Sequence, residues 1–427
     1  MNLRIPLLLG AAMAVAAAAL VTGCNASRVI PSAPPTGSAT AMHLPPPGKL
    51  FNWLQPGIDS THAAYNTKEK TLNAKTIANL KLGWSFSASG STAPILTDGS
   101  LAIANTSNYV YGIAAKTGKQ KWSFETYASQ NNGFTYAAIG GSLVYVGCNV
   151  GGYNTQEGIC AVNARSGKLS WSWYINCRCQ LQAFNLAAPV VSGSTVVAGY
   201  YTGGPYGKNV LIALNATTGA LIWEVTAGSG NNSLADAVPA IDGGNVFAGT
   251  DYGLCSYQLS SGTLNWCSGP NDAFTAPAIS KGVVYISTNS HGFYAFNEST
   301  GAQLWQYTPS GYANPFSPPA IAGNTAYFST SDGGAVYAFN TATGSLLFTA
   351  GGGSRGIEII SSPSVANGVV YAACYGGLCA FDASTGNLIS TIGPGAESVD
   401  SPTISDGRIY VTCGTRSGGF YPCMYDT

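Results

Sequence analysis

Cysteines are the residues of this sequence with the clearest chemical potential. The chain has 11 of them, and the ten that follow Cys24 are an even number, which predicts a framework of disulfides if the chain is exported. Cys177 and Cys179, in the stretch INCRCQ, are placed for a small strained disulfide, for a pair of thiolates on a soft metal such as Cu(I), or for free thiols. Because the chain has only three histidines, no supporting metal ligand is evident. We expect a disulfide here and no bound metal.

Other catalytic constellations are missing from the sequence. So few histidines make a Ser-His-Asp arrangement or a zinc site implausible, and no glycine-rich loop carries the lysine of a phosphate cradle. The formal net charge is zero and no Lys/Arg cluster occurs, so the electrostatic footprint of a nucleic-acid-binding protein is absent. We therefore expect no catalytic residues, no cofactor and no nucleic acid, and we favour a binding function.

The N-terminus indicates export and attachment to a membrane. Arg4 precedes an apolar run that extends to Val21, and the following VTGC resembles a bacterial lipobox in which Cys24 is acylated. An ordinary cleaved signal peptide or an anchor helix is the alternative. The resemblance makes residues 1–23 a signal peptide and 24–48 a Pro/Ser/Ala-rich tether. By the same resemblance, Asn25 favours the outer membrane, facing the periplasm or the cell surface.

A sequence repeat predicts the strands that position these residues. NATTGALIW, from Asn215 to Trp223, recurs with small changes around a turn glycine, at spacings of 39 to 52 residues, the period of a four-stranded propeller blade. The glycines are Gly118, Gly167, Gly219, Gly262, Gly301, Gly344 and Gly386. The position four residues later holds Trp122, Trp171, Trp223, Trp266 and Trp305, and then Phe348 and Ser390. We expect these tryptophans to be structural and to wedge against the neighbouring blade.

Each copy has an upstream half, such as APAISKGVVYIST from Ala276, which reads as two strands around a glycine turn. A blade therefore has strands A and B from this half and strands C and D around the repeated turn. There are seven complete units and an incomplete one from Ser401, for which LKLGWSF with Trp84 supplies the missing strand. The sequence predicts an all-β, eight-bladed propeller over 81–427, closed by pairing of that N-terminal strand with the C-terminal blade.

The pattern A-x-N/D-x-x-T/S-G-x-x-x-W resembles that of the pyrroloquinoline-quinone (PQQ) type propellers, over about residues 51 to 427. The lead-in segment, residues 49–80, adds to the resemblance and is expected to pack on the disc. Its matching positions are Trp53, Asp59, Tyr65, Asn66, Leu72 and Leu80. For a quinoprotein dehydrogenase the resemblance implies PQQ with calcium beside a vicinal Cys-Cys disulfide. This chain has no Cys-Cys pair and no C-x-x-C-H haem site, and the cofactor ligands cannot be placed.

The repeat also suggests partners for eight of the cysteines. Cys160, Cys255, Cys379 and Cys423 share a column on strand C, and Cys148, Cys374 and Cys413 share one on strand B. This register pairs three cysteines of strand B with three of strand C across the B–C hairpins, and pairs Cys255 with a cysteine of strand D. The predicted pairs are Cys148 with Cys160, Cys374 with Cys379, Cys413 with Cys423, and Cys255 with Cys267.

Binding is expected where the blades do not repeat. The A–B and C–D turns are short and alike, whereas the B–C loops and the loops between blades, on the opposite face, are irregular and aromatic. Candidates for stacking or partner packing are Tyr153, Tyr200, Tyr201, Tyr206, Tyr312, Phe316, Phe420 and Tyr421. The scarce charges near the central mouth are Arg178, Asp236, Asp272, Arg355, Glu358 and Asp400. Alternatively, the aromatics only cover blade ends and the charges are solvated or locally paired.

These features favour a non-catalytic, monomeric envelope lipoprotein that presents its loop-rich face to a protein partner. A lipobox followed by a propeller of this repeat and size is similar to the BamB-type lipoproteins of the outer-membrane protein assembly machine. A glycan-binding surface protein and a PQQ-dependent dehydrogenase are the alternatives.

Overall fold

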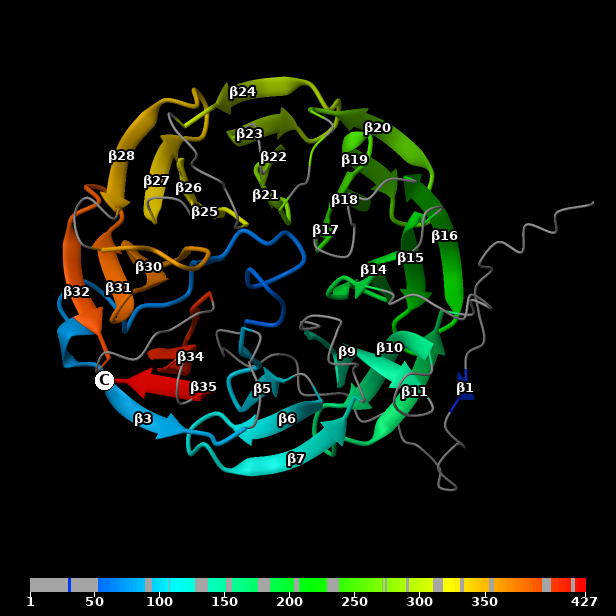
Figure 1. Ribbon diagram of the computed structural model, residues 1–427, viewed down its shortest axis with the longest axis horizontal. Helices are drawn as coiled ribbons and strands as arrows, with labels where there is room; N and C mark the ends of the chain where they lie inside the picture. Colours follow the sequence, from blue (N-terminus) through cyan, green and yellow to red (C-terminus); the bar gives the residue numbers. More distant parts are fainter. Residues whose placement is uncertain are drawn as a thin grey trace, which may run out of the picture.

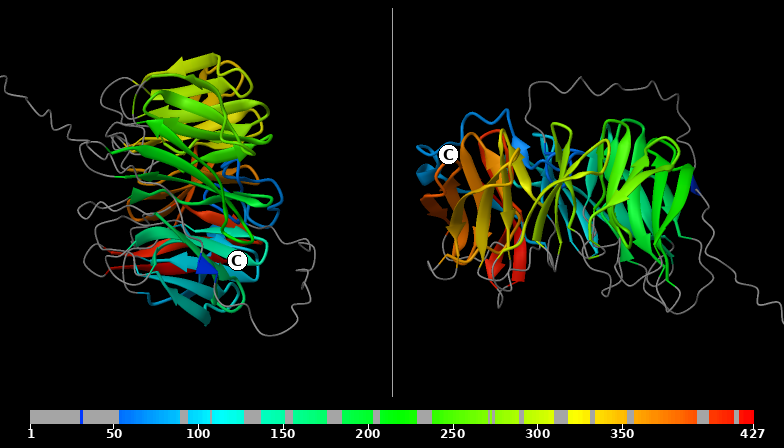
Figure 2. Two further views of the ribbon diagram at one scale, coloured as in Figure 1. Left: turned by 90° about the vertical axis from the view of Figure 1, so that its right-hand side faces the viewer. Right: turned by 90° about the horizontal axis from the view of Figure 1, so that it is seen from above.

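The computed structural model places eight twisted antiparallel sheets as blades around a central axis (Figure 1). It describes residues 30–31, 53–88, 94–106, 108–126, 137–150, 156–175, 185–202, 207–228, 238–270, 272, 275–288, 292–309, 318–330, 334–352, 357–393, 401–415 and 419–427. Within these ranges the only helix is the short 3-10 turn η1 (Ile77–Asn79). Seen from the side, the blades form a disc about one strand thick (Figure 2). The fold is thus the all-β, eight-bladed propeller that the repeat predicts.

Every blade follows the order A, B, C, D from the axis outward, and strand A is only two or three residues long. Blade one has β4 (Leu96–Thr97), β5 (Leu101–Asn105), β6 (Tyr109–Ala114) and β7 (Gln120–Glu125); blade two has β8 (Ala138–Gly140), β9 (Leu143–Val150), β10 (Gln156–Asn163) and β11 (Leu169–Tyr174). Blade three has β13 (Val190–Ser192), β14 (Thr195–Tyr201), β15 (Asn209–Asn215) and β16 (Leu221–Gly228), with β12 (Asn185–Leu186) also paired to β14. Blade four has β17 (Ala240–Asp242), β18 (Asn245–Thr250), β19 (Gly253–Gln258) and β20 (Leu264–Ser268).

The second half of the ring repeats this order. Blade five has β21 (Ala278–Ser280), β22 (Val283–Thr288), β23 (Gly292–Asn297) and β24 (Gln303–Tyr307); blade six has β25 (Ala320–Ala322), β26 (Thr325–Ser329), β27 (Ala335–Asn340) and β28 (Leu346–Gly351). Blade seven has β29 (Ser364–Ala366), β30 (Val369–Cys374), β31 (Gly377–Asp382) and β32 (Leu388–Ile392). Blade eight joins β33 (Thr403–Ser405), β34 (Arg408–Thr415) and β35 (Gly419–Asp426) to β3 (Lys81–Ser85), which pairs antiparallel with β35.

Two further short strands precede β3 in the sequence. β1 (Ile30–Pro31) pairs antiparallel with the outer edge of β11, and β2 (Tyr65–Asn66) pairs in parallel with β29. Residues 1–29, with the expected signal peptide and Cys24, lie outside the described part of the chain. No helix among the described residues has the length and apolar character needed to cross a membrane.

The repeated tryptophan locks each blade to the next one. Trp171 of blade two is buried, and its Nε1 donates a hydrogen bond to the carbonyl of Ala216 in the C–D turn of blade three, at 3.0 Å. A Cβ on Gly219 of that turn would lie 2.5 Å from the Trp171 ring, and φ at Gly219 is +72°. Glycine is therefore required here for two reasons: the turn needs a left-handed backbone, and the indole leaves no room for a side chain. The other donor and acceptor pairs are Trp84 and Ala115, Trp122 and Ala164, Trp223 and Leu259, Trp266 and Glu298, and Trp305 and Thr341.

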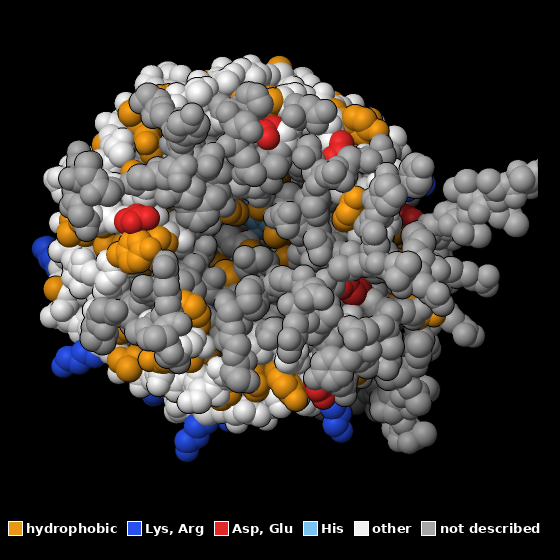
Figure 3. All heavy atoms as spheres, in the orientation of Figure 1, with side chains coloured by type: hydrophobic (Ala, Val, Ile, Leu, Met, Phe, Trp, Pro, Cys, Tyr) orange, Lys and Arg blue, Asp and Glu red, His pale blue; other side chains and the backbone are white. Residues whose placement is uncertain are grey.

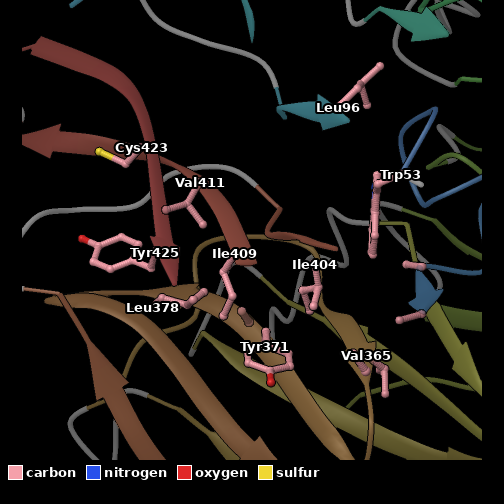
Figure 4. Packing of buried hydrophobic residues seen from close by; sticks show 14 of the residues in the cluster. Trp53, Leu96, Val365, Tyr371, Leu378, Ile404, Ile409, Val411, Cys423 and Tyr425 are labelled. Carbon is pink, nitrogen blue, oxygen red and sulfur yellow. The ribbon is translucent and has the colours of Figure 1, made fainter. Parts of the chain in front are cut away.

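The core lies between the blades. One buried cluster, for example, combines Ile159 and Trp173 of blade two with Val196 and Ile212 of blade three. The largest cluster also includes Trp53 of the lead-in segment, together with residues of blades seven and eight (Figure 4). The ring therefore buries its apolar surface chiefly at blade interfaces, as expected for a stacked repeat.

The described part of the chain contains four disulfides, joining the pairs that the cysteine columns predict. They are Cys148–Cys160, Cys374–Cys379, Cys413–Cys423 and Cys255–Cys267. The first three cross a B–C hairpin diagonally, while Cys255 and Cys267 are directly opposite each other on β19 and β20. Cys177 and Cys179 lie outside the described residues.

Candidate functional site

The most unusual feature of the ring is a stretch of the lead-in, residues 53–66, which we call the central segment. It contacts the innermost strand of all eight blades. Its backbone exchanges two hydrogen bonds of 2.8 Å between Trp53 and Thr97 of blade one. Carbonyls of Leu54, Ser60, Thr61, Ala63 and Ala64 then accept, in order, from the N–H groups of Ile139, Ile241, Ile279, Ile321 and Val365, in blades two, four, five, six and seven. These distances range from 2.6 to 2.9 Å.

Two amide side chains complete the circle. Gln55, buried, accepts from the backbone N–H of Val191 in blade three and donates to its carbonyl, both at 2.8 Å. Asn66, also buried, donates from Nδ2 to the carbonyl of Ile404 in blade eight at 2.7 Å. This part of the lead-in, which was expected to pack on the disc, therefore runs inside the ring and connects blades that do not touch each other. Later lead-in residues do pack on the disc, where Glu69 and Leu72 accept hydrogen bonds from the A–B turns of blades eight and seven.

The central segment turns tightly to reach successive blades. Its backbone is left-handed at Gly57, Ile58, His62 and Ala64, with φ between +48° and +84°. A Cβ on Gly57 would lie 2.7 Å from the Cα of His62, so glycine is needed at this close approach. The Asp59 carboxylate accepts hydrogen bonds from the backbone and hydroxyl of Thr61, at 2.9 and 2.7 Å, which fixes the turn between them.

A cavity of about 120 Å³ lies against the central segment. The face of the molecule in Figure 3 is hollowed at the centre of the ring. Described lining residues from the segment are Trp53, Pro56, Gly57, His62 and Ala64, and those from the blades are Pro94, Val238, Ala276, Pro318, Ser362, Pro363, Ser364 and Ser401. The blade residues stand at or just before the starts of the A strands. The wall is thus mainly apolar, with one imidazole and three hydroxyls.

His62 is the titratable residue among the described lining residues of this cavity. It is 1% exposed, and burial lowers its pKa from 6.5 to about 4, despite the opposing effects of Asp59 and of a hydrogen bond with the backbone of Pro277. Its Nε2 has no hydrogen-bond partner in the structure. Since proline offers only a carbonyl, the imidazole must donate to Pro277 through Nδ1. Nε2 is then a buried, unused acceptor in a neutral ring.

PQQ with calcium, which the resemblance implies for a dehydrogenase, does not fit these donors. The quinone is a polycarboxylate, and calcium takes oxygen ligands from carboxylates, amides and carbonyls. The described lining residues include no carboxylate, side-chain amide or cationic group. Across the described ranges, no group of three or more His, Cys, Asp or Glu residues gathers where it could hold a metal ion. We derive no chemical step through this cofactor.

Six residues of the predicted binding face fall in the described part of the chain. Tyr201, Asp272, Glu358 and Phe420 are half-buried, and Tyr421 is 36% exposed. Tyr200, in contrast, is 1% exposed and packs against Trp173 between blades two and three, so its assignment to the binding face is wrong. The alternation of side chains along β14 turns it into the interface. The remaining candidates, Tyr153, Tyr206, Arg178, Asp236, Tyr312, Phe316, Arg355 and Asp400, lie outside the described residues.

Two exposed aromatics of this face were not among the predicted residues. Tyr252 is 63% exposed in the turn between β18 and β19, and Tyr375 is 42% exposed between β30 and β31. The backbone N–H of Tyr375 donates to the carbonyl of Glu358 at 3.0 Å, which places this predicted residue beside it. Both tyrosines occupy two-residue B–C turns, whereas long irregular B–C loops were expected. Together with Tyr421 they define what we call the tyrosine face.

Two glutamates carry perturbed carboxyl groups on strands of blades two and three. Burial raises the pKa of Glu157 on β10 to about 8, and it also raises the pKa of Glu224 on β16, which Lys208 opposes. One carboxyl oxygen of each, Oε2, is buried without a hydrogen-bond partner. Neither glutamate belongs to a group of three or more His, Cys, Asp or Glu residues that could hold a metal ion among the described residues.

The fold is that of the PQQ-like eight-bladed β-propellers. A family model described as outer membrane protein assembly factor BamB matches residues 27–204 and 68–307. This match covers more than half of the chain, and the chain belongs to that family.

The names of individual relatives indicate different functions. Tetrathionate hydrolase of Acidithiobacillus ferrooxidans is 26% identical over 271 residues, covering 60% of this chain and 52% of that protein. BamB of Yersinia pestis is 30% identical over 228 residues, covering 48% and 56%. The chain thus spans about half the length of these relatives. Among solved structures, a europium-containing methanol dehydrogenase superposes with a TM-score of 0.71 over 90% of this chain and 98% of its own, at 13% identity, which shows the fold alone.

Proposed function

We propose that this protein is a non-catalytic scaffold of the bacterial cell envelope that binds a protein partner through the tyrosine face. The observation that carries the proposal is the central segment. It occupies the ring with the chain's own backbone and leaves a cavity of about 120 Å³ without charged lining among the described residues. An enzyme that uses the channel of the ring would need catalytic or cofactor-holding groups there. These features therefore favour a functional site on the outer surface of the ring.

Membership of the assembly-factor family supports the choice of partner. Exposed tyrosines on a rigid ring are suited to protein contacts, because they bury a large area at a small loss of side-chain freedom. Anchoring through an acylated Cys24, at the outer membrane, would hold this face near envelope proteins. The same lipid anchor and the tether of residues 24–48 remain part of the proposal.

Crosslinking in intact cells tests the proposal. A photoreactive phenylalanine analogue would replace Tyr252, Tyr375 or Tyr421 one at a time. The controls place the same analogue at Leu264 or Leu304, which are 52% and 49% exposed on the outer D strands. We expect a discrete adduct with an envelope protein, identified by mass spectrometry, from the tyrosine positions and not from the controls. Equal adducts from both sets, or none from the tyrosines, would refute the partner face.

The two alternatives make distinct predictions for purified protein. A PQQ-dependent dehydrogenase would gain quinone absorbance and reduce a dye with alcohols when supplied with calcium and the quinone, and we expect neither. A glycan-binding protein would bind a glycan array, with loss of binding in the Tyr252→Ala variant. A positive array together with no crosslinked protein would replace the scaffold by a lectin.

A further inference from the structure

The central cavity has the properties of a ligand site rather than of a packing defect. A void in an apolar core is normally lined by apolar atoms alone. This one is lined by His62, whose Nε2 is buried without a partner, and by Ser362, Ser364 and Ser401. Leaving a buried acceptor unpaired is unfavourable, and the left-handed backbone at His62 holds the imidazole in this position.

The protonation state of His62 specifies the hydrogen bond that a ligand must make. With a pKa of about 4 the ring is neutral near pH 7, and Nδ1 is used by the backbone of Pro277. Nε2 can then only accept. A ligand that satisfies it must present a hydroxyl or N–H donor. A carboxylate or phosphate would offer only acceptors.

The wall specifies the rest of the ligand. Trp53, Pro56 and Val238 are apolar, and the described lining has no Lys, Arg, Asp or Glu to compensate a charge. Burying an unpaired charge is strongly unfavourable, so the ligand must be neutral. A cavity of about 120 Å³ is close to the ~150 Å³ that accommodates benzene. A single small ring with one hydroxyl matches this space.

We propose that the central cavity binds a small uncharged hydroxylic molecule of the size of phenol, with its apolar body against Trp53 and its hydroxyl donating to Nε2 of His62. None of its lining residues belongs to the tyrosine face, and the proposal does not depend on the proposed partner. It is a binding site, and no bond is made or broken in it.

Calorimetric titration of the purified full propeller with phenol and with toluene tests the proposal. The two molecules have nearly the same shape, but only phenol can donate a hydrogen bond. We expect phenol to bind saturably with one site, and toluene to bind about tenfold more weakly or worse, because Nε2 would stay unpaired. Ala276→Leu should abolish both by filling the cavity.

Two variants keep the result interpretable. In His62→Asn, asparagine tolerates the left-handed backbone and withdraws the imidazole, so the preference for phenol over toluene should fall to within about twofold. Leu264→Ala, which is 52% exposed on the outer strand β20 and does not line the cavity, should bind phenol as the wild type does. Circular dichroism and the melting temperature show that each variant is folded. No phenol binding by the wild type, equal affinity for toluene, or an unchanged preference in His62→Asn would overturn the proposal.

Discussion

Gln55→Leu is the perturbation that tests most directly whether the central segment holds the ring together. Both polar atoms of the Gln55 side chain bond to the backbone of Val191, 136 residues away, at 2.8 Å, and both residues are buried. Leucine has a similar size but leaves one N–H and one C=O of blade three without partners. At about 1 to 3 kcal/mol for each unsatisfied buried group, partly relieved by water or local relaxation, we expect a loss of roughly 2 to 4 kcal/mol.

The assay is equilibrium unfolding in urea with the disulfides intact, followed by tryptophan fluorescence and by circular dichroism. The matched control is Gln303→Leu on the exposed edge strand β24, which should change the free energy of unfolding by less than about 0.5 kcal/mol. Gln55→Glu separates the two bonds, because its carboxylate can accept from the N–H of Val191 but opposes the carbonyl. Its destabilisation should shrink as the pH falls and the carboxyl gains a proton. A Gln55→Leu protein as stable as the control would refute the role of the segment.

Three further predictions concern the blades themselves. Trp305→Phe removes the 2.9 Å hydrogen bond to Thr341 and should lower the free energy of unfolding by about 1 kcal/mol, since Phe348 fills the same position naturally in the next blade. Trp305→Ala should lower it by about 3 to 5 kcal/mol in the same assay. Replacing Cys255 and Cys267 together by alanine should lower the free energy of unfolding by about 2 to 3 kcal/mol. A non-reducing peptide map of the wild-type protein should recover these two cysteines in one linked fragment. Glu157→Gln should remove a pH dependence of the stability. The pKa of Glu157 is raised from 4.5 to about 8, so its contribution to stability is complete below pH 4.5 and is lost as the pH rises towards 8. Melting temperatures measured over this pH range should show the decline in the wild type and not in the glutamine variant.

Local repetition explains what the sequence could predict. The turn glycine and the tryptophan four residues later recur because Trp171 needs Gly219 in the next blade, and the same requirement holds around the ring. The cysteine columns work for the same reason, since equivalent positions on strands B and C have equivalent neighbours. Even Ser390 follows this logic. Blade eight takes its strand D from β3, so no C–D turn faces that position and a tryptophan would have no glycine to contact.

The central segment could not be predicted in this way, because it does not repeat. Nothing near Gln55 in the sequence indicates that its amide meets Val191, and nothing near His62 indicates a buried, left-handed position. The binding face was predicted by loop length and aromatic content. That criterion wrongly included Tyr200, whose strand position buries it, and missed Tyr252, which a two-residue turn exposes.

The central segment also changes how the ring should respond to a ligand. Each blade of a propeller otherwise contacts only its neighbours, so blades could loosen one at a time. A segment bonded to all eight innermost strands couples blades on opposite sides, and the same segment supplies Trp53 and His62 to the cavity. A molecule bound there stabilises the folded ring by RT ln(1 + [L]/Kd), and this gain requires the segment to be in place. Binding in the cavity and resistance of the whole ring to opening are therefore linked through one short stretch of chain.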